Sequence, residues 1–109
     1  MASKQSTMDY IMDQIAQAGV MRYRKMFGEY AIYCNEKVVA FVCDDQLFLK
    51  PTIAGKALIK DLEEAPPYPG AKLYYLISPD LWEDREFLTS LIAATAEELP
   101  LPKPKKKIS

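Results

Sequence analysis

The sequence predicts an α+β domain, with an antiparallel sheet of about four to five strands and flanking helices in the order α-β-β-β(-β)-α-β-α. Apolar residues recur at helical spacing towards both ends of the chain. The middle is rich in β-branched and aromatic residues, interrupted by short polar corners. With 109 residues the chain suits one domain. We expect that domain over residues 1–99, followed by a Pro/Lys-rich disordered tail over 100–109.

The first predicted element is a helix over residues 7–18. Met8, Ile11 and Ile15 recur with the spacing of a helix that buries one stripe. Ser6 or Thr7 can cap its start, and Gly19 suits a left-handed residue just after its end. We expect this stripe to face the sheet.

The strands of a meander come next. Asn35-Glu36 and Asp44-Asp45 are the predicted corners, because Asn and Asp tolerate the left-handed backbone of tight turns. The glycine usual at the second turn position is missing, which leaves a longer first loop open. The expected extended segments are 20–28, 29–34, 37–43 and 46–50.

The remaining elements complete the α-β-α order. Pro51 ends a strand and Thr52 caps a helix over 53–62. Three prolines and a glycine make 65–70 a loop. A strand over 71–77 and a helix from Ser78-Pro79 to residue 99 are the last elements expected.

Neither face of this predicted sheet is polar. Antiparallel sheets usually leave one face to water, and a large exposed apolar face marks an interaction site. Either helices and loops of the chain cover both faces, or the bulkier face contacts a protein partner or a second copy. Two-residue turns place Ala31, Tyr33, Val38, Ala40, Val42, Leu47 and Leu49 on one face, and Tyr30, Ile32, Val39, Phe41, Cys43 and Phe48 on the other. Tyr30, Phe41 and Phe48 are therefore the predicted partner-binding residues.

Basic residues suggest an alternative, contact with nucleic acid phosphates. The residues concerned are Arg22, Arg24 and Lys25, with Lys105, Lys106 and Lys107 in the tail. Two observations oppose it. Without its four tail lysines the chain has five more acidic than basic residues, whereas phosphate binding depends on positive charge. Alternate side chains of an extended segment also point to opposite sides.

The residue types needed for catalysis are scarce. The sequence has no histidine and no Cys-x-x-Cys motif, and its four glycines lie far apart. We interpret Asp44-Asp45 as turn residues rather than a cation site. We therefore expect no enzyme, no cofactor and no metal. The absence of a signal peptide or a long apolar run leads us to expect a cytoplasmic protein, with Cys34 and Cys43 reduced and buried.

Three stretches carry a family resemblance: RKMFGEY at 24–30, IYC at 32–34, and VCDDQLFLKPT followed by Ala54-Gly55. They resemble the N-terminal domain of the TfoX/Sxy family, over roughly residues 8–99, as a single-domain member. The resemblance implies a bacterial regulator of competence that acts with the transcription machinery. It also implies a two-layer fold similar to secretion chaperones, and no catalytic residues. We expect a small non-enzymatic regulatory or protein-interaction module.

Overall fold

The computed structural model describes residues 4–26 and 29–100, and it confirms the α+β class. One six-stranded sheet has the order β1-β2-β3-β4-β6-β5, with every neighbouring pair antiparallel. The strands are β1 (Met21–Met26), β2 (Glu29–Cys34), β3 (Lys37–Cys43), β4 (Gln46–Leu49), β5 (Glu63–Ala65) and β6 (Tyr74–Ile77). The sheet has one strand more than predicted, because the short β5 pairs with β6 at the edge.

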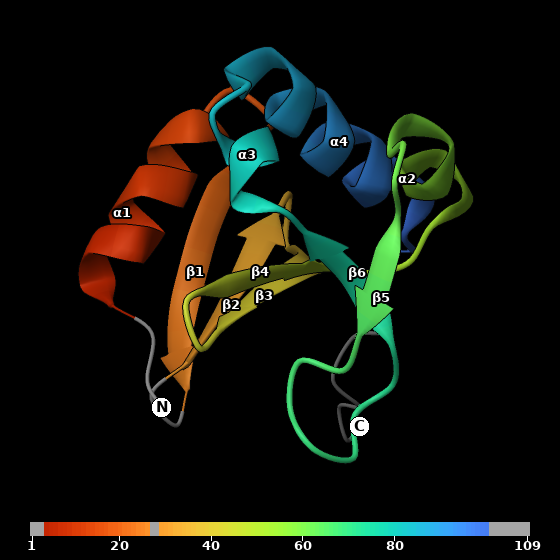
Figure 1. Cartoon of the computed structure of the whole chain (residues 1–109). Helices are drawn as coiled ribbons and strands as arrows, with labels where there is room; N and C mark the ends of the chain where they lie inside the picture. The colour runs from red at the N-terminus through yellow and green to blue at the C-terminus, as the bar shows by residue number, and fades with distance from the viewer. Residues whose placement is uncertain (1–3, 27–28, 101–109) are drawn as a thin grey trace, which may run out of the picture.

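The helices all lie on the same side of the sheet, which gives the molecule two layers (Figure 1). They are α1 (Gln5–Gln14), α2 (Ile53–Leu58), α3 (Pro79–Trp82) and α4 (Arg85–Glu98). The single helix predicted after Ser78 is thus two helices. Asp84 separates them, because its carboxylate accepts a hydrogen bond from the Phe87 N–H at 3.1 Å and so begins α4.

The two ends of α1 differ from the prediction. Lys4 is the N-cap residue and has no capping side chain, so neither Ser6 nor Thr7 has that position. The helix ends at Gln14, and Gly19 is not in the left-handed region. Gly19 is needed instead for a close approach, since a Cβ there would lie 2.9 Å from both Cys34 Sγ and Asn35 Oδ1.

Both hairpin corners are two-residue turns. Asn35 and Glu36 have φ of 53° and 69°, and Asp44 and Asp45 have φ of 53° and 59°. Positive φ at both central residues is the type I′ pattern, which matches the twist of paired strands. The turns predicted from the sequence are therefore confirmed, and the first needs no extra residue.

The core lies between the helices and the sheet. Gln14 is a buried polar residue that connects α1 with α3, because its amide donates to the Trp82 carbonyl at 2.7 Å. In the part of the chain that the structure describes, no helix is long and apolar enough to cross a membrane. The fully buried side chains include Met8, Ile11 and Ile15 of the N-terminal segment, Leu88, Leu91 and Ile92 of α4, and Ile32, Val42, Leu47, Leu49 and Ile77 of the sheet.

Candidate protein-binding surface

The pairing of β2 with β3 contains an irregularity that decides which residues share a face. Ala31 pairs with Phe41 and Ile32 with Ala40, whereas Tyr33 pairs with Val38. One residue of β3, Val39, is thus extra at this point, as in a β-bulge. The predicted pairing of Tyr33 with Val38 is confirmed, but that of Ala31 with Ala40 is wrong by one residue. A one-residue shift moves side chains to the other face.

The predicted pairs between β3 and β4 are confirmed. Val42 pairs with Leu47, and Ala40 pairs with Leu49. Tyr30, Ile32 and Cys34 of β2 join these four residues on the face that the helices cover, where all seven belong to the buried core. On the other side of the sheet lies the surface that we call the open face: Tyr33, Phe41, Phe48, Tyr74 and Leu76.

Tyr30 therefore does not lie beside Phe41 and Phe48, contrary to the prediction. It is 2% exposed and lies under α1, where its hydroxyl donates to Gln5 Oε1 at 3.2 Å. Its ring also meets the Tyr23 ring edge to face, with centroids 5.4 Å apart. Tyr30 is part of the contact between α1 and the sheet, and it is not accessible to a partner on the open face.

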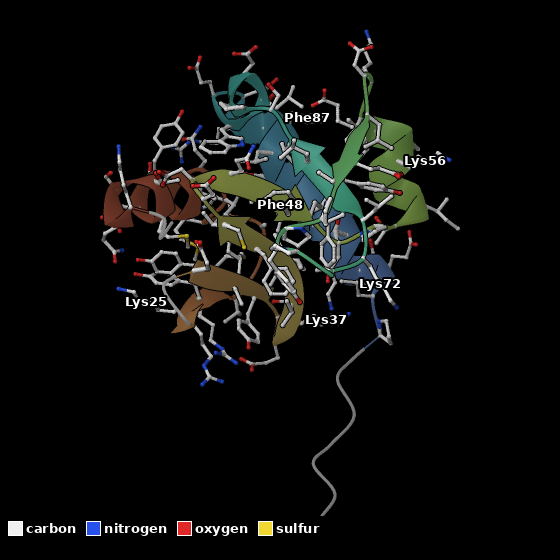
Figure 2. The ribbon with its side chains drawn as sticks, turned by 60° about the horizontal axis from the view of Figure 1, so that its bottom comes forward. Lys25, Lys37, Phe48, Lys56, Lys72 and Phe87 are labelled. Atoms are coloured by element: carbon white, nitrogen blue, oxygen red, sulfur yellow. The ribbon has the colours of Figure 1, made fainter. Side chains whose placement is uncertain are left out.

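Phe41 and Phe48 do lie on the open face, with different exposure. Phe48 is near the middle of this face in Figure 2, with α4 behind the sheet. It is only 3% exposed, since Phe41 and Leu76 flank it on the neighbouring strands. Phe41 is half-buried and meets Tyr74 edge to face, with centroids 5.5 Å apart. Phe41 and Tyr74 therefore present accessible aromatic surface, whereas Phe48, beside Phe41 on the same face, is almost fully buried.

Part of the cover on this side comes from the chain itself. The segment between β5 and β6 extends beyond the sheet on the side away from the helices (Figure 1). Pro67 of that segment is buried, whereas Tyr68 and Leu73 are exposed. The open face is thus bordered by a loop at one end and has no helix over its centre.

The three basic residues of β1 do not form one patch. Arg22 and Arg24 pair with Tyr33 and Ala31 and so lie on the open face, whereas Lys25, the residue after Arg24, projects on the helix side. The Arg22 guanidinium carbon lies 4.0 Å from the Tyr33 ring centroid. The predicted tail residues Lys105, Lys106 and Lys107 lie outside the described residues.

Arg22 is also held by a carboxylate. Its Nη2 lies 3.0 Å from Glu36 Oε1, and this hydrogen bond raises the pKa of Arg22 and lowers the pKa of Glu36. Both side chains are exposed, so the pair adds little to stability. It does orient the guanidinium along Tyr33. A phosphate would have to compete with Glu36 for it, which weakens the nucleic acid alternative.

The two cysteines are free and buried, as predicted. Burial raises the pKa of the Cys34 thiol. Burial, helped by Glu29 and Asp44, raises the pKa of Cys43 to about 11. A thiol with a raised pKa is a poor nucleophile at neutral pH, because the thiolate is the reactive form. Neither cysteine has the environment of a catalytic residue.

The remaining candidates for a chemical site are a metal-binding cluster and a surface hollow. Within residues 4–26 and 29–100, no three metal-ligating side chains gather into a group that could hold an ion. A hollow of about 590 Å³ lies between α2, α3 and α4, with Ile59, Leu81 and Phe87 among its apolar walls and Asp61 and Asp80 at its polar ones. The sequence did not indicate this hollow, because its walls come from segments far apart in the chain. None of the predicted site residues lines it.

Together these features define a two-layer α+β domain with helices on one side of its sheet and accessible aromatic residues on the other. The family model of the TfoX N-terminal domain matches residues 13–99. An uncharacterized 12.7 kDa protein in the trpE 5′ region of Spirochaeta aurantia is 42% identical over 106 residues, which cover 97% of this chain and 91% of that protein. The chain therefore belongs to the TfoX N-terminal domain family, which confirms the resemblance of its sequence motifs.

Proposed function

We propose that the protein is a small non-enzymatic regulatory module that binds a protein partner through the open face. The observation that carries this proposal is the one-sided placement of the helices. It leaves Tyr33, Phe41 and Tyr74 partly accessible on a sheet whose other side is fully packed. Aromatic residues are enriched in protein interfaces, where they contribute much of the binding energy.

Membership of the TfoX N-terminal domain family supports a regulatory role, with a component of the transcription machinery as the partner. A non-enzymatic role agrees with the lack of histidine in the sequence and with the raised thiol pKa values. Buried free thiols also suit the reducing cytoplasm, where such a partner would be met. A protein partner fits better than nucleic acid, because Glu36 already holds Arg22.

Affinity capture from the native host tests the proposal. We expect Phe41→Ser to lose a partner that the wild-type protein captures, because the serine removes the accessible ring that meets Tyr74 on the open face. Ile53→Ser is the matched control, since Ile53 is 82% exposed on α2, away from that face. Thermal unfolding of each variant shows whether it is folded at the capture temperature. Identical capture by wild type and folded Phe41→Ser would refute a role for the open face.

A further inference from the structure

The outer edge of β1 presents backbone groups that another strand could pair with. The Asn35 N–H donates to the Val20 carbonyl at 2.9 Å, which fixes the phase of the β1–β2 ladder. Along two antiparallel strands, pairs of residues that exchange backbone hydrogen bonds alternate with pairs that do not. Arg22 and Arg24 therefore direct their N–H and C=O groups towards β2. The backbone groups of Met21, Tyr23 and Lys25 point away from the sheet, and we call them the β1 edge.

This edge is open in the structure. Among residues 4–26 and 29–100, no hydrogen bond occupies the outward backbone groups of Met21, Tyr23 or Lys25. Two of its side chains are accessible, since Tyr23 is 36% exposed and Lys25 is exposed, whereas Met21 is half-buried. Lys25 projects from the rim of the molecule in Figure 2. β1 is also six residues long, whereas β5 at the opposite edge has three, so β1 offers the longer template for strand addition.

The charges of β1 indicate which strand could add there. Arg22 and Arg24 would occupy the non-hydrogen-bonded positions towards a new antiparallel strand, where facing side chains come closest. Like charges at such positions destabilise pairing, and opposite charges stabilise it. Two copies pairing through β1 would set Arg22, Arg24 and Lys25 against one another. Arg24 has no ion pair within the described part of the chain, so it is available to a carboxylate.

We propose that the β1 edge binds an extended acidic segment of a protein partner as an additional strand. Its residues opposite Arg22 and Arg24 are acidic and lie over the open face. The acidic residue opposite Arg24 meets a guanidinium with no ion pair in the described part of the chain, whereas the one opposite Arg22 has to share that side chain with Glu36. The residue between them is apolar and contacts the accessible part of the Tyr23 ring on the helix side. This proposal names the partner chemistry for the interaction module proposed above, and it rests on that partner being a protein.

A peptide titration tests the proposal directly. The probe is the end-blocked peptide Thr-Thr-Glu-Val-Glu-Thr-Thr, and the matched control replaces both glutamates with lysine. With the full ¹⁵N-labelled chain, we expect the acidic peptide to give saturable shifts and at least about tenfold slower hydrogen exchange at the amides of residues 21, 23 and 25. Equal effects of the two peptides, or no effect of either at these amides, would overturn the proposal.

Two pairs of variants separate charge from backbone pairing. Arg24→Glu should reverse the preference so that the lysine peptide binds more tightly, while Lys72→Glu, outside β1, should leave it unchanged. Lys25→Pro removes one outward N–H without touching the β2 ladder, and Lys25→Gln removes the charge but keeps the N–H. We expect Lys25→Pro to bind the acidic peptide about tenfold more weakly than Lys25→Gln does. Equal affinity of these two variants would contradict strand addition.

The peptide titration and the capture experiment together distinguish failure of strand addition from failure of the proposed function. If Phe41→Ser loses a captured partner while the acidic peptide does not bind the β1 edge, the module binds a protein without adding a strand. If the peptide binds as described and Phe41→Ser captures every wild-type partner, the edge is the contact and the open face is not.

Discussion

Asp45 shows how one side chain can connect two distant elements. Its carboxylate accepts hydrogen bonds from the Lys4 N–H at 2.8 Å and from the Thr7 hydroxyl at 2.9 Å. The start of α1 is thereby capped from the β3–β4 turn rather than from its own sequence. Cap preferences within the helix could not predict this, because the acceptor is 41 residues away from Lys4. The turn position of Asp45 itself was predictable.

Asp45 makes stability depend on pH in the acidic range. The Lys4 N–H first, and the Thr7 hydroxyl second, lower the pKa of Asp45 from its ordinary value of 3.8. A carboxyl group whose pKa is lower in the folded state than in the unfolded state stabilises the fold at pH values above its unfolded-state pKa. This stabilisation is lost as the pH falls through the folded-state pKa. We expect wild type to exceed Asp45→Asn in urea midpoint at neutral pH, and the difference to shrink below about pH 4. Asp61→Asn is the control. A difference in urea midpoint between wild type and Asp45→Asn that does not change with pH would contradict the prediction.

Strand pairing shows where sequence periodicity suffices and where it does not. The richness in β-branched and aromatic residues located β2, β3 and β4, and the Asn and Asp corners gave the correct two-residue turns. The extra residue Val39 was not predictable, because neither glycine nor proline marks it. Every residue of β2, Tyr30 and Tyr33 included, was consequently assigned to the wrong face relative to Phe41 and Phe48. The three-residue β5 was missed since its Glu63 and Glu64 have low strand propensity.

The helices show a similar division. The helical spacing of apolar residues near the C-terminal end agrees with α4, in which Leu88, Leu91 and Ile92 are buried. The predicted helix over 53–62 is shorter, because Ile59 has an extended backbone with ψ of 124°. Ala57 and Leu58, at the end of α2, are exposed. Such short helices depend on contacts from the rest of the molecule, which a local pattern does not contain.

The start of α2 is held by hydrogen bonds to two side chains. The Thr52 hydroxyl accepts from the Gly55 N–H at 2.9 Å, and the Glu98 carboxylate accepts from Ile53 and Ala54, each at 2.9 Å. We expect Thr52→Ala to lower the free energy of unfolding by about 1 kcal/mol. The Gly55 amide should also exchange faster with solvent. Ser90→Ala on α4 is the control, and unchanged exchange at Gly55 would argue against a capping role.

At the scale of the whole molecule, stability comes from the single layer of contacts between helices and sheet. Leu91 lies fully buried in that layer, at the middle of α4. Leu91→Ala should cost about 2–5 kcal/mol, because it removes buried methyl groups and leaves a cavity. Leu58→Ala is the matched control on an exposed side chain and should cost less than about 0.5 kcal/mol. Chemical denaturation measures both, and similar losses would mean that the core lies elsewhere.

Trp82 gives the molecule a built-in optical reporter. It is the one tryptophan in the sequence, and its indole N–H donates to the Ile77 carbonyl at 3.0 Å in a buried site. Its backbone carbonyl also receives the Gln14 amide, so α1, α3 and β6 meet around it. Loss of any of these contacts admits water to the indole and moves its emission to longer wavelength. Intrinsic fluorescence therefore follows the assembly of both layers in unlabelled protein.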